Sequence, residues 1–210
     1  MSEIFKEAFG QIVEFLEYIE KTKDIKYYLV GGVLVNIYSI FRTTQDIDFV
    51  VDIESQDIAI EEYVSYLKGG NFDPMQDWDN AILLSKETNI LQYFDQKNYV
   101  KFDNYIIQRA NPNKYKKIGP IALKRRVRKE LFNKKCWVES KEDFILSKLV
   151  FGGWQDYSDA LGCWIRFESD LDVPYLQENS KFLHIEGEFE LLSSGVSDPD
   201  EFFEKLRRNQ

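Results

Sequence analysis

The chain has 210 residues, 44% of them hydrophobic and 15% aromatic, which is enough apolar material for a folded core and excludes an intrinsically disordered protein. A formal net charge of −9 repels a phosphate backbone at long range and argues against a general nucleic-acid binder. No apolar run reaches the roughly 20 residues that cross a bilayer, and the N-terminus lacks the basic and apolar regions of a secretory signal, so we expect a cytoplasmic protein without membrane contact.

Histidine and cysteine are too sparse for several common kinds of site. Cys136 and Cys163 have no CxxC spacing and are far fewer than a disulfide-rich domain needs, so we expect reduced thiols. His184 is the only histidine, and it lies away from any serine or cysteine motif. A His-based catalytic triad and a Cys/His zinc site are therefore both poorly supported.

The N-terminal quarter of the chain predicts helices and strands in alternation. Apolar residues at three- and four-residue spacing indicate the buried stripe of a surface helix, and short β-branched and aromatic runs indicate strands. The pair Gly31-Gly32 stops the first strand just before a second helical stretch. The expected elements are a helix over residues 4–19, a strand over 26–30, a helix over 33–41 and a strand over 46–51 that is buried on both faces.

The middle of the chain predicts more sheet, and the C-terminal part predicts helices. Ser55 is expected to cap one helix and Ser140 to cap the first helix of the C-terminal part. The expected elements are a helix over residues 55–67, a polar loop over 71–80, antiparallel strands over 81–84, 90–94 and 99–107, and helices from 140 onward. We place a boundary near Glu139, between a catalytic core of residues 1–139 and a helical region of residues 140–210 packed on it.

Two aspartates at the start of the predicted strand 46–51 form a candidate metal site. Residues two apart on a strand project to the same face, so Asp46 and Asp48 direct two carboxylates at one point. Mg²⁺ prefers oxygen ligands and commonly takes one or two protein carboxylates together with substrate phosphates. Taken alone, such a pair fits a turn cap beside a solvated side chain as well.

Gly31 and Gly32 are candidates for phosphate binding. Glycines between a strand and a helix let the backbone approach a ligand closely, and the helix N-terminus offers N–H groups to a phosphate. An anion site and a cation site then share one βαβ-like unit. Without that context, an ordinary tight turn explains the glycine pair as well.

The segment YLVGGVLVNIYSIFRTTQDIDFVV resembles the signature of the nucleotidyltransferase superfamily, a glycine pair followed after a helix by a hydrophobic-flanked DxD. More narrowly, the order GG, R-x-T, DIDF is similar to the toxin and abortive-infection (AbiEii-like) nucleotidyltransferases. Residues 139–149, ESKEDFILSKL, resemble the helix start S-P-E-D-L-I-L-x-K-L of these proteins, with Lys141 in place of the proline. The resemblance covers most of residues 26–165. It implies an α+β nucleotidyltransferase fold, with a mixed β-sheet flanked by helices and a helical C-terminal region.

The resemblance also implies a third carboxylate on a later strand. Asp103, in YVKFDNYI, best matches the family's K-x-D strand, and Asp95 is the competing choice. The family pattern continues with an apolar strand where this chain has Asn104. By resemblance, Asp46 and Asp48 bind both metal ions, Mg²⁺ or Mn²⁺, and Asp103 serves as base or ligand for the attacking hydroxyl.

Three more residues are candidates for nucleotide binding beside the glycine pair. Arg42 and Thr44 lie just before the DxD, where a guanidinium can grip a triphosphate and a hydroxyl can order the loop. A structural salt bridge explains Arg42 as well. Lys148 belongs to the second family match, and its position fits either a phosphate contact or a side chain whose stem lies along apolar neighbours.

A run of basic residues lies between positions 114 and 135, where ten Lys and Arg residues stand against only Glu130. In an acidic protein this is a candidate seat for RNA or for the triphosphate tail, although charge runs are commonly solvated faces. The residues that we expect to contact RNA are Lys114, Lys124, Arg125, Arg126 and Arg128.

Together these patterns predict a metal-dependent nucleotidyltransferase that moves a nucleoside monophosphate from a nucleoside triphosphate to a hydroxyl acceptor. Toxin-type relatives suggest RNA, especially tRNA, or a protein side chain as acceptor, and an antitoxin protein as partner, whereas small-molecule relatives modify aminoglycosides. The basic run favours RNA. Two alternatives stay open: a catalytically silent nucleotidyltransferase-like module that binds a nucleotide or a protein, and an interaction protein of unrelated fold.

Overall fold

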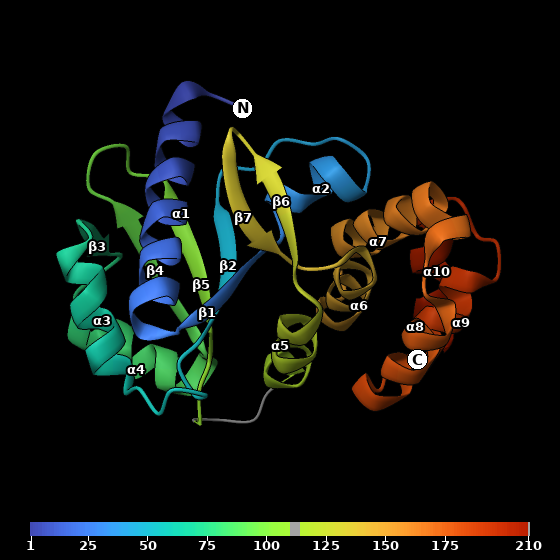
Figure 1. The fold of residues 1–210 in the computed structure, drawn as a ribbon. Coiled ribbons are helices and arrows are strands. Elements are labelled where there is room, and N and C mark those ends of the chain that lie inside the picture. Colours follow the sequence, from blue (N-terminus) through green and yellow to red (C-terminus); the bar gives the residue numbers. More distant parts are fainter. Residues whose placement is uncertain (110–113, 210) are drawn as a thin grey trace. The chain divides into compact units, whose positions relative to one another are not determined.

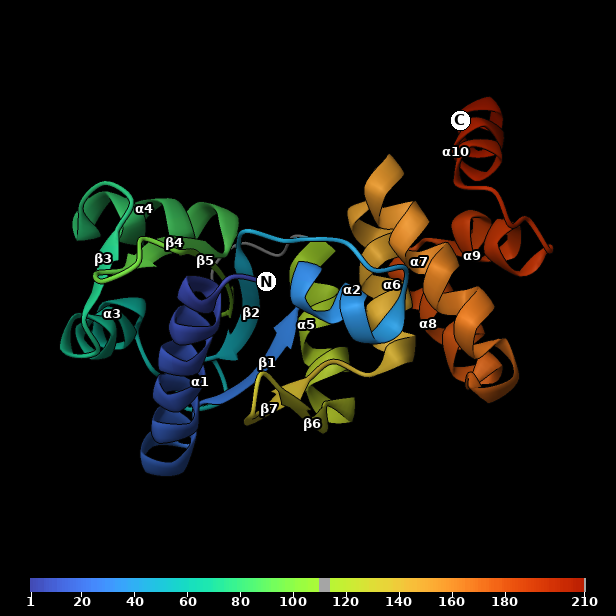
Figure 2. The same cartoon turned by 90° about the horizontal axis from the view of Figure 1, so that it is seen from above.

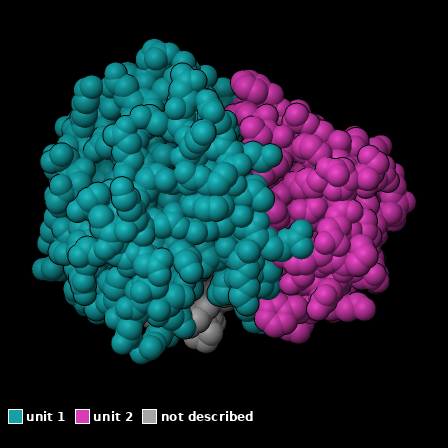
Figure 3. Space-filling model, viewed as in Figure 1, with its two compact units in different colours: residues 1–33, 43–139 teal, residues 34–42, 140–210 magenta. Residues whose placement is uncertain are grey.

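The computed structural model describes residues 1–109 and 114–209 (Figure 1). The chain forms two compact units, residues 1–33 with 43–139 and residues 34–42 with 140–210, which Figure 3 colours separately. The domains expected from the sequence, 1–139 and 140–210, stay a prediction, because compactness alone does not show that a unit folds by itself. Within the described part of the chain, every helix is too short or too polar to cross a bilayer.

The first unit is built on a seven-stranded mixed sheet. Its strands are β1 (Lys26–Val30), β2 (Ile47–Asp52), β3 (Phe72–Pro74), β4 (Ile90–Asp95), β5 (Lys101–Ile107), β6 (Val127–Leu131) and β7 (Lys134–Val138). Their order is β3-β4-β5-β2-β1-β7-β6; β2 pairs in parallel with β5 and β1 with β7, and the other neighbours are antiparallel. With helices flanking this sheet, the expected α+β architecture is confirmed.

One face of the sheet carries an aromatic core. Side chains alternate between the two faces along a strand, and in β4 and β5 burial alternates with them. Phe49, Tyr93 and Phe102 lie on the buried face, with ring centroids 5.5 to 6.4 Å apart. Burial of these rings therefore fixes which residues of β2, β4 and β5 are left for the opposite face.

Helices pack on both faces of the sheet. Neighbouring tyrosines of β1 show this, because their hydroxyls donate hydrogen bonds in opposite directions, Tyr27 to Glu17 and Tyr28 to the carbonyl of Gly119. The helices of this unit are α1 (Glu3–Lys23), α3 (Ile60–Gly69), α4 (Trp78–Thr88) and α5 (Lys114–Arg125). Glu17 belongs to α1 on the aromatic face, and Gly119 belongs to α5 on the other face. Figure 2 shows these two helices on opposite sides of β1.

The second unit is helical, as expected for residues 140 onward. Ser140 caps its first helix as predicted, because its hydroxyl oxygen accepts a hydrogen bond from the Asp143 amide at 3.1 Å. Tyr157 packs against Phe202, with 5.3 Å between their ring centroids. The helices are α6 (Lys141–Phe151), α7 (Trp154–Phe167), α8 (Val173–Leu183), α9 (Glu186–Ser193) and α10 (Pro199–Asn209), with a 3-10 turn over Glu168–Asp170.

The strand expected over residues 81–84 is wrong, because these residues lie in α4. Asp77 caps the start of this helix by accepting a hydrogen bond from the Asn80 amide at 2.9 Å, and Asn89 ends it in the left-handed conformation. A run of four apolar residues fits a helix or a strand equally, so the capping residues decide. The loop expected over residues 71–80 also contains β3.

Two further expectations need correction. The helix expected from residue 55 begins at Ile60, because the Asp52 carboxylate accepts hydrogen bonds from the amide and hydroxyl of Ser55 and holds that residue in a turn. The βαβ-like unit expected around the glycine pair is absent from the described chain, since β1 and β2 are antiparallel. Between them lies the short helix α2 (Gly32–Tyr38), and residues 34–42 belong to the second unit.

Cys136 and Cys163 are buried free thiols, as expected. Burial raises the pKa of the Cys136 thiol to about 12, so its reactive thiolate is scarce at neutral pH. Cys136 is therefore a packing residue of β7.

Asn104 stands where the resembled family has an apolar strand, and the two ends of its amide have different partners: its Nδ2 donates a hydrogen bond to the Tyr105 carbonyl at 3.2 Å. Its side chain is fully buried on β5, and its Oδ1 accepts a hydrogen bond from the Tyr63 hydroxyl of α3 at 2.7 Å. We predict that Tyr63→Phe lowers the free energy of unfolding by about 1–3 kcal/mol, because it leaves a buried acceptor unsatisfied. Urea denaturation measures this, with the more exposed Tyr66→Phe of the same helix as control; equal effects of the two variants would contradict the prediction.

Candidate active site

The glycine pair makes room for two side chains of the predicted site. Gly31 has a φ of +69°, and a Cβ at this position would lie 2.2 Å from Asp48 Oδ2. A Cβ on Gly32 would lie 2.6 Å from Thr44 Oγ1, whose hydroxyl donates a hydrogen bond to the Asp46 carbonyl at 3.1 Å. Protein interiors have no room for contacts this short. Glycine at both positions therefore admits Asp48 and Thr44 beside the turn.

Asp48 and Asp103 lie side by side on neighbouring strands. In the parallel pair of β2 and β5, Asp48 stands opposite Asp103, so both carboxylates project from the same face of the sheet. The Gly32 amide donates a hydrogen bond to Asp48 Oδ2 at 3.4 Å, which ties this carboxylate to the glycine turn. Both acids lie on the face opposite the aromatic core.

An ammonium group bridges Asp46 to Asp103. Lys101 Nζ lies 3.1 Å from Asp46 Oδ2 and 2.9 Å from Asp103 Oδ2. Lys101 and Asp103 are two residues apart on β5 and so share a face. Gln92 of β4 donates to the second oxygen, Asp103 Oδ1, at 2.8 Å. Both carboxylate oxygens of Asp103 are thus bonded.

The charge on Lys101 is stabilised by its two acidic neighbours. Partial burial lowers the pKa of Lys101, but hydrogen bonds and charge attraction from Asp103 and Asp46 outweigh it and raise that pKa above its ordinary value. A persistent positive charge therefore stands between the two carboxylates at neutral pH.

The position of the Lys101 ammonium indicates that these acids can hold a cation. Asp46 and Asp103 converge on one cation, and carboxylate oxygens are the ligands that Mg²⁺ and Mn²⁺ prefer. Asp48 is the neighbour of Asp103 across the strand pair. The donor set fits. Among the described residues, no group of three His, Cys, Asp or Glu side chains is arranged so that it could hold a metal ion. In this arrangement the Lys101 ammonium lies between Asp46 and Asp103.

Asp95, the competing third acid, lies on the opposite face from Asp103. The β4–β5 register pairs Gln92 with Asp103 and Tyr93 with Phe102, so Asp95 shares the aromatic face with Tyr93. It is fully buried, and its carboxylate accepts hydrogen bonds from the amides of Asn98 and Val100 at 2.6 and 2.8 Å. Asp95 therefore holds the turn between β4 and β5.

Arg42 and Lys148, both predicted to bind nucleotide, share one buried carboxylate in the second unit. Arg42 Nη2 lies 2.9 Å from Asp159 Oδ2 and Arg42 Nε 3.2 Å from its Oδ1. Lys148 Nζ lies 3.0 Å from Asp159 Oδ2 and 2.8 Å from Asp156 Oδ1. Burial lowers the pKa of Lys148, but the charges of Asp156 and Asp159 outweigh it and raise that pKa. Both cations have structural partners, and their contact with nucleotide stays a prediction.

Part of the basic run pairs with acidic residues of α1. Arg126 and Arg128 also lie over the ring of Trp137, at 4.3 and 4.9 Å from its centroid. The RNA contact expected of the run stays a prediction; the side chain of Lys114 lies outside the described residues. The ion pairs with α1 are Arg126–Glu20, Arg128–Glu17 at 2.5 Å and Lys134–Glu14 at 2.6 Å.

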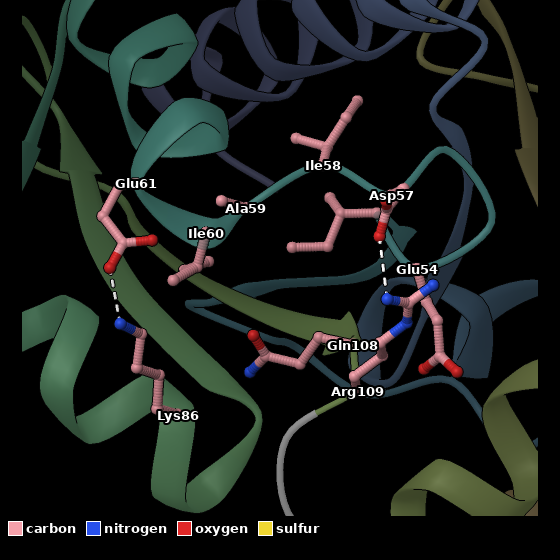
Figure 4. A pocket seen from close by; sticks show the side chains of 10 residues that line it. Glu54, Asp57, Ile58, Ala59, Ile60, Glu61, Lys86, Gln108 and Arg109 are labelled. Atoms are coloured by element: carbon pink, nitrogen blue, oxygen red, sulfur yellow. Dashed lines mark hydrogen bonds and ion pairs between the residues drawn. The ribbon is translucent and has the colours of Figure 1, made fainter.

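Two hollows of the first unit lie near the C-terminal ends of β2 and β5, whereas Asp46 precedes the start of β2. One, of about 360 Å³, contains two ion pairs among its lining residues (Figure 4). The other, of about 580 Å³, is lined in part by Lys26 and Lys124. Neither is lined by Asp46, Asp48 or Asp103, so the candidate site lies apart from both hollows.

Sequence reasoning missed Lys101, Gln92 and Asp159. Lys101 has a usable signal, because it stands two residues before Asp103 on a predicted strand and must share its face. Gln92 becomes visible only when the register of β4 on β5 is known, and Asp159 only when the packing of α7 is known.

Comparison with solved structures relates this fold to nucleotidyltransferase-like proteins. An antigenic nucleotidyltransferase-like protein from Paracoccidioides brasiliensis aligns with a TM-score of 0.50 at 15% identity, over 82% of this chain and 87% of its own. The antibiotic-resistance factor ANT(2″)-Ia aligns with a TM-score of 0.52 at 10% identity, over 90% of this chain and 99% of its own. No family model and no curated protein matches the chain. At these identities the likeness shows the fold, which is the one that the sequence resemblance implies.

Gly31→Ala tests the steric role of the glycine turn. The added methyl group meets Asp48 and forces alanine into a positive φ, which alone costs about 1–2 kcal/mol. We expect lower stability and binding of Mn²⁺ with a non-hydrolysable nucleotide weakened by roughly tenfold or more, measured by thermal unfolding and calorimetry. Gly69→Ala is the matched control, because a Cβ there would point into open space; unchanged binding in Gly31→Ala would contradict the steric role.

Asp95→Asn and Asp103→Asn separate the structural acid from the candidate catalytic one. Asp95→Asn replaces one of the two carboxylate oxygens that accept hydrogen bonds from the turn amides of Asn98 and Val100, so we expect a loss of about 1–3 kcal/mol of stability with Mn²⁺–nucleotide affinity preserved. Asp103→Asn should preserve stability and weaken the Mn²⁺–nucleotide affinity. The reciprocal result, with affinity lost only in Asp95→Asn, overturns the assignment.

Proposed function

We propose that this chain is a metal-dependent nucleotidyltransferase that moves a nucleoside monophosphate from a nucleoside triphosphate to a hydroxyl group. The observation that carries the proposal is the convergence of Asp46 and Asp103 on one cation, Lys101 Nζ. Asp48 stands opposite Asp103 in the strand pair and accepts a hydrogen bond from the glycine turn. The arrangement lies in a fold shared with nucleotidyltransferase-like proteins.

Asp46, Asp48 and Asp103 are the residues that would hold Mg²⁺ or Mn²⁺. When bound, the metal neutralises phosphate charge and orients the reacting oxygens. Gly31, Gly32 and Thr44 lie beside these acids and are proposed to contact the triphosphate. The family resemblance assigns Arg42 and Lys148 to the triphosphate as well.

The chemical step needs positioning and one proton acceptor. The acceptor hydroxyl oxygen attacks the α-phosphorus of the triphosphate; a new O–P bond forms, and the bond to the pyrophosphate oxygen breaks. Asp103 is proposed to orient the hydroxyl and to take its proton. Gln92 keeps the Asp103 carboxylate aimed while this happens. The fixed charges of the site supply the rest of the catalysis.

For the acceptor we propose RNA, with an antitoxin protein as the partner of a toxin-type enzyme. The support is the sequence resemblance and the basic run, of which Arg126 and Arg128 are already paired with α1. Of the structural neighbours, ANT(2″)-Ia is an antibiotic-resistance factor, so a small-molecule hydroxyl is the competing acceptor that the assay includes.

A label-transfer assay tests the proposal. The protein is incubated with Mg²⁺, each α-labelled nucleoside triphosphate, and separately total RNA, protein or an aminoglycoside, beside an Asp46→Ala/Asp48→Ala variant. We expect transfer to RNA that falls at least about a hundredfold in the double variant and stops when the metal is chelated.

Two outcomes redirect the proposal. Transfer to an aminoglycoside alone replaces RNA as the acceptor. Nucleotide binding without transfer to any acceptor would contradict the proposed transferase activity. The remaining function would then be that of a catalytically silent nucleotide-binding module.

A further inference from the structure

We propose that Lys101 is a positioning residue that acts as an internal counterion. Its ammonium occupies the position between Asp46 and Asp103 and must move away before a divalent ion can bind there. Metal binding therefore becomes dependent on the nucleotide. The inference rests on the proposed function and deepens it.

The geometry makes the ammonium and the metal alternatives. Lys101 Nζ lies within 3.1 Å of one oxygen of each acid, and a divalent ion would approach those oxygens to about 2.0–2.1 Å. Two cations on the same pair of oxygens repel each other strongly in a partly desolvated site. Those two oxygens can therefore serve the ammonium or the metal ion, but not both at once.

The surrounding residues allow this exchange. Gln92 holds Asp103 Oδ1 at 2.8 Å independently of the ammonium, so Asp103 stays oriented when Lys101 moves. The Lys101 side chain is 26% exposed, and its flexible four-carbon stem can swing without disturbing β5. The ammonium carries three donors and no acceptor, so a phosphate oxygen is a suitable new partner.

The exchange couples the two ligands. A metal arriving alone has to displace Lys101 from two carboxylates and leave its charge without those partners. A metal arriving with a triphosphate gives the ammonium a new anion. Such coupling is reciprocal, so the nucleotide tightens metal binding by the same factor as the metal tightens nucleotide binding.

Mn²⁺ binding measured by electron paramagnetic resonance tests the inference, with and without an α,β-methylene nucleoside triphosphate. Lys101→Met keeps the length of the side chain and removes its charge; we expect it to tighten Mn²⁺ binding in the absence of nucleotide by roughly tenfold or more and to shrink the coupling factor. Lys97→Met removes the same unit of charge from an exposed pair with Glu7 and should match the wild type.

A second measurement uses the wild-type protein, in case Lys101→Met does not fold. The rate at which Lys101 is acylated, followed by mass spectrometry, should rise when Mn²⁺ alone is added to saturation, because the ammonium loses its two carboxylate partners. The acylation rate of Lys97 should stay constant. An unchanged rate at Lys101 overturns the inference.

The outcomes separate the inference from the function on which it rests. If the wild type binds Mn²⁺ with the nucleotide but Lys101→Met leaves the affinity for Mn²⁺ alone unchanged or weaker, the counterion role falls and the proposed function stands. If Mn²⁺ fails to bind even with nucleotide, and Asp46→Asn changes nothing, the metal–nucleotide site itself is wrong.

Discussion

The parallel pairing of β2 with β5 is the constraint on which the candidate site depends. It sets Asp48 opposite Asp103, and the alternation of side chains then places Lys101 beside Asp103 and turns Asp95 to the other face. A slip of one residue between these strands exchanges the faces, which would bury the acids and expose the aromatic rings. Burial of the rings on one face therefore specifies which side chains stand on the other.

Local patterns predict the elements that carry the site. The alternation in DIDFVV predicts β2, and the glycine pair predicts the turn before α2. These predictions succeed because the signals lie within a few residues of each other. The strand predicted over residues 81–84 fails for a related reason: four apolar residues contain too little periodicity, and the caps that decide, Asp77 and Asn89, lie outside the run.

Long-range pairings set the limit of sequence reasoning here. Asp95 and Asp103 are both strand aspartates, and only the register of β4 on β5 tells which one faces Asp48. The basic run shows the same limit, because Arg126 pairs with Glu20, 106 positions earlier in the chain. The sequence of the run indicates an anion site, but in the fold three of its residues pair with glutamates of α1. Pairings of this kind depend on topology, which hydrophobic periodicity does not encode.

The close approach of Asp48 to Gly31 couples the substitutions that evolution can accept at positions 31 and 48. While a lineage keeps the carboxylate at position 48, any side chain at position 31 collides with it. When the carboxylate is given up, the collision disappears, and only the positive φ of 69° still restricts position 31, a restriction that asparagine or aspartate also meets. Position 31 is then free to drift. Among relatives of this chain, loss of the glycine should therefore accompany loss of the acid, which makes position 31 a marker of whether the site is still in use.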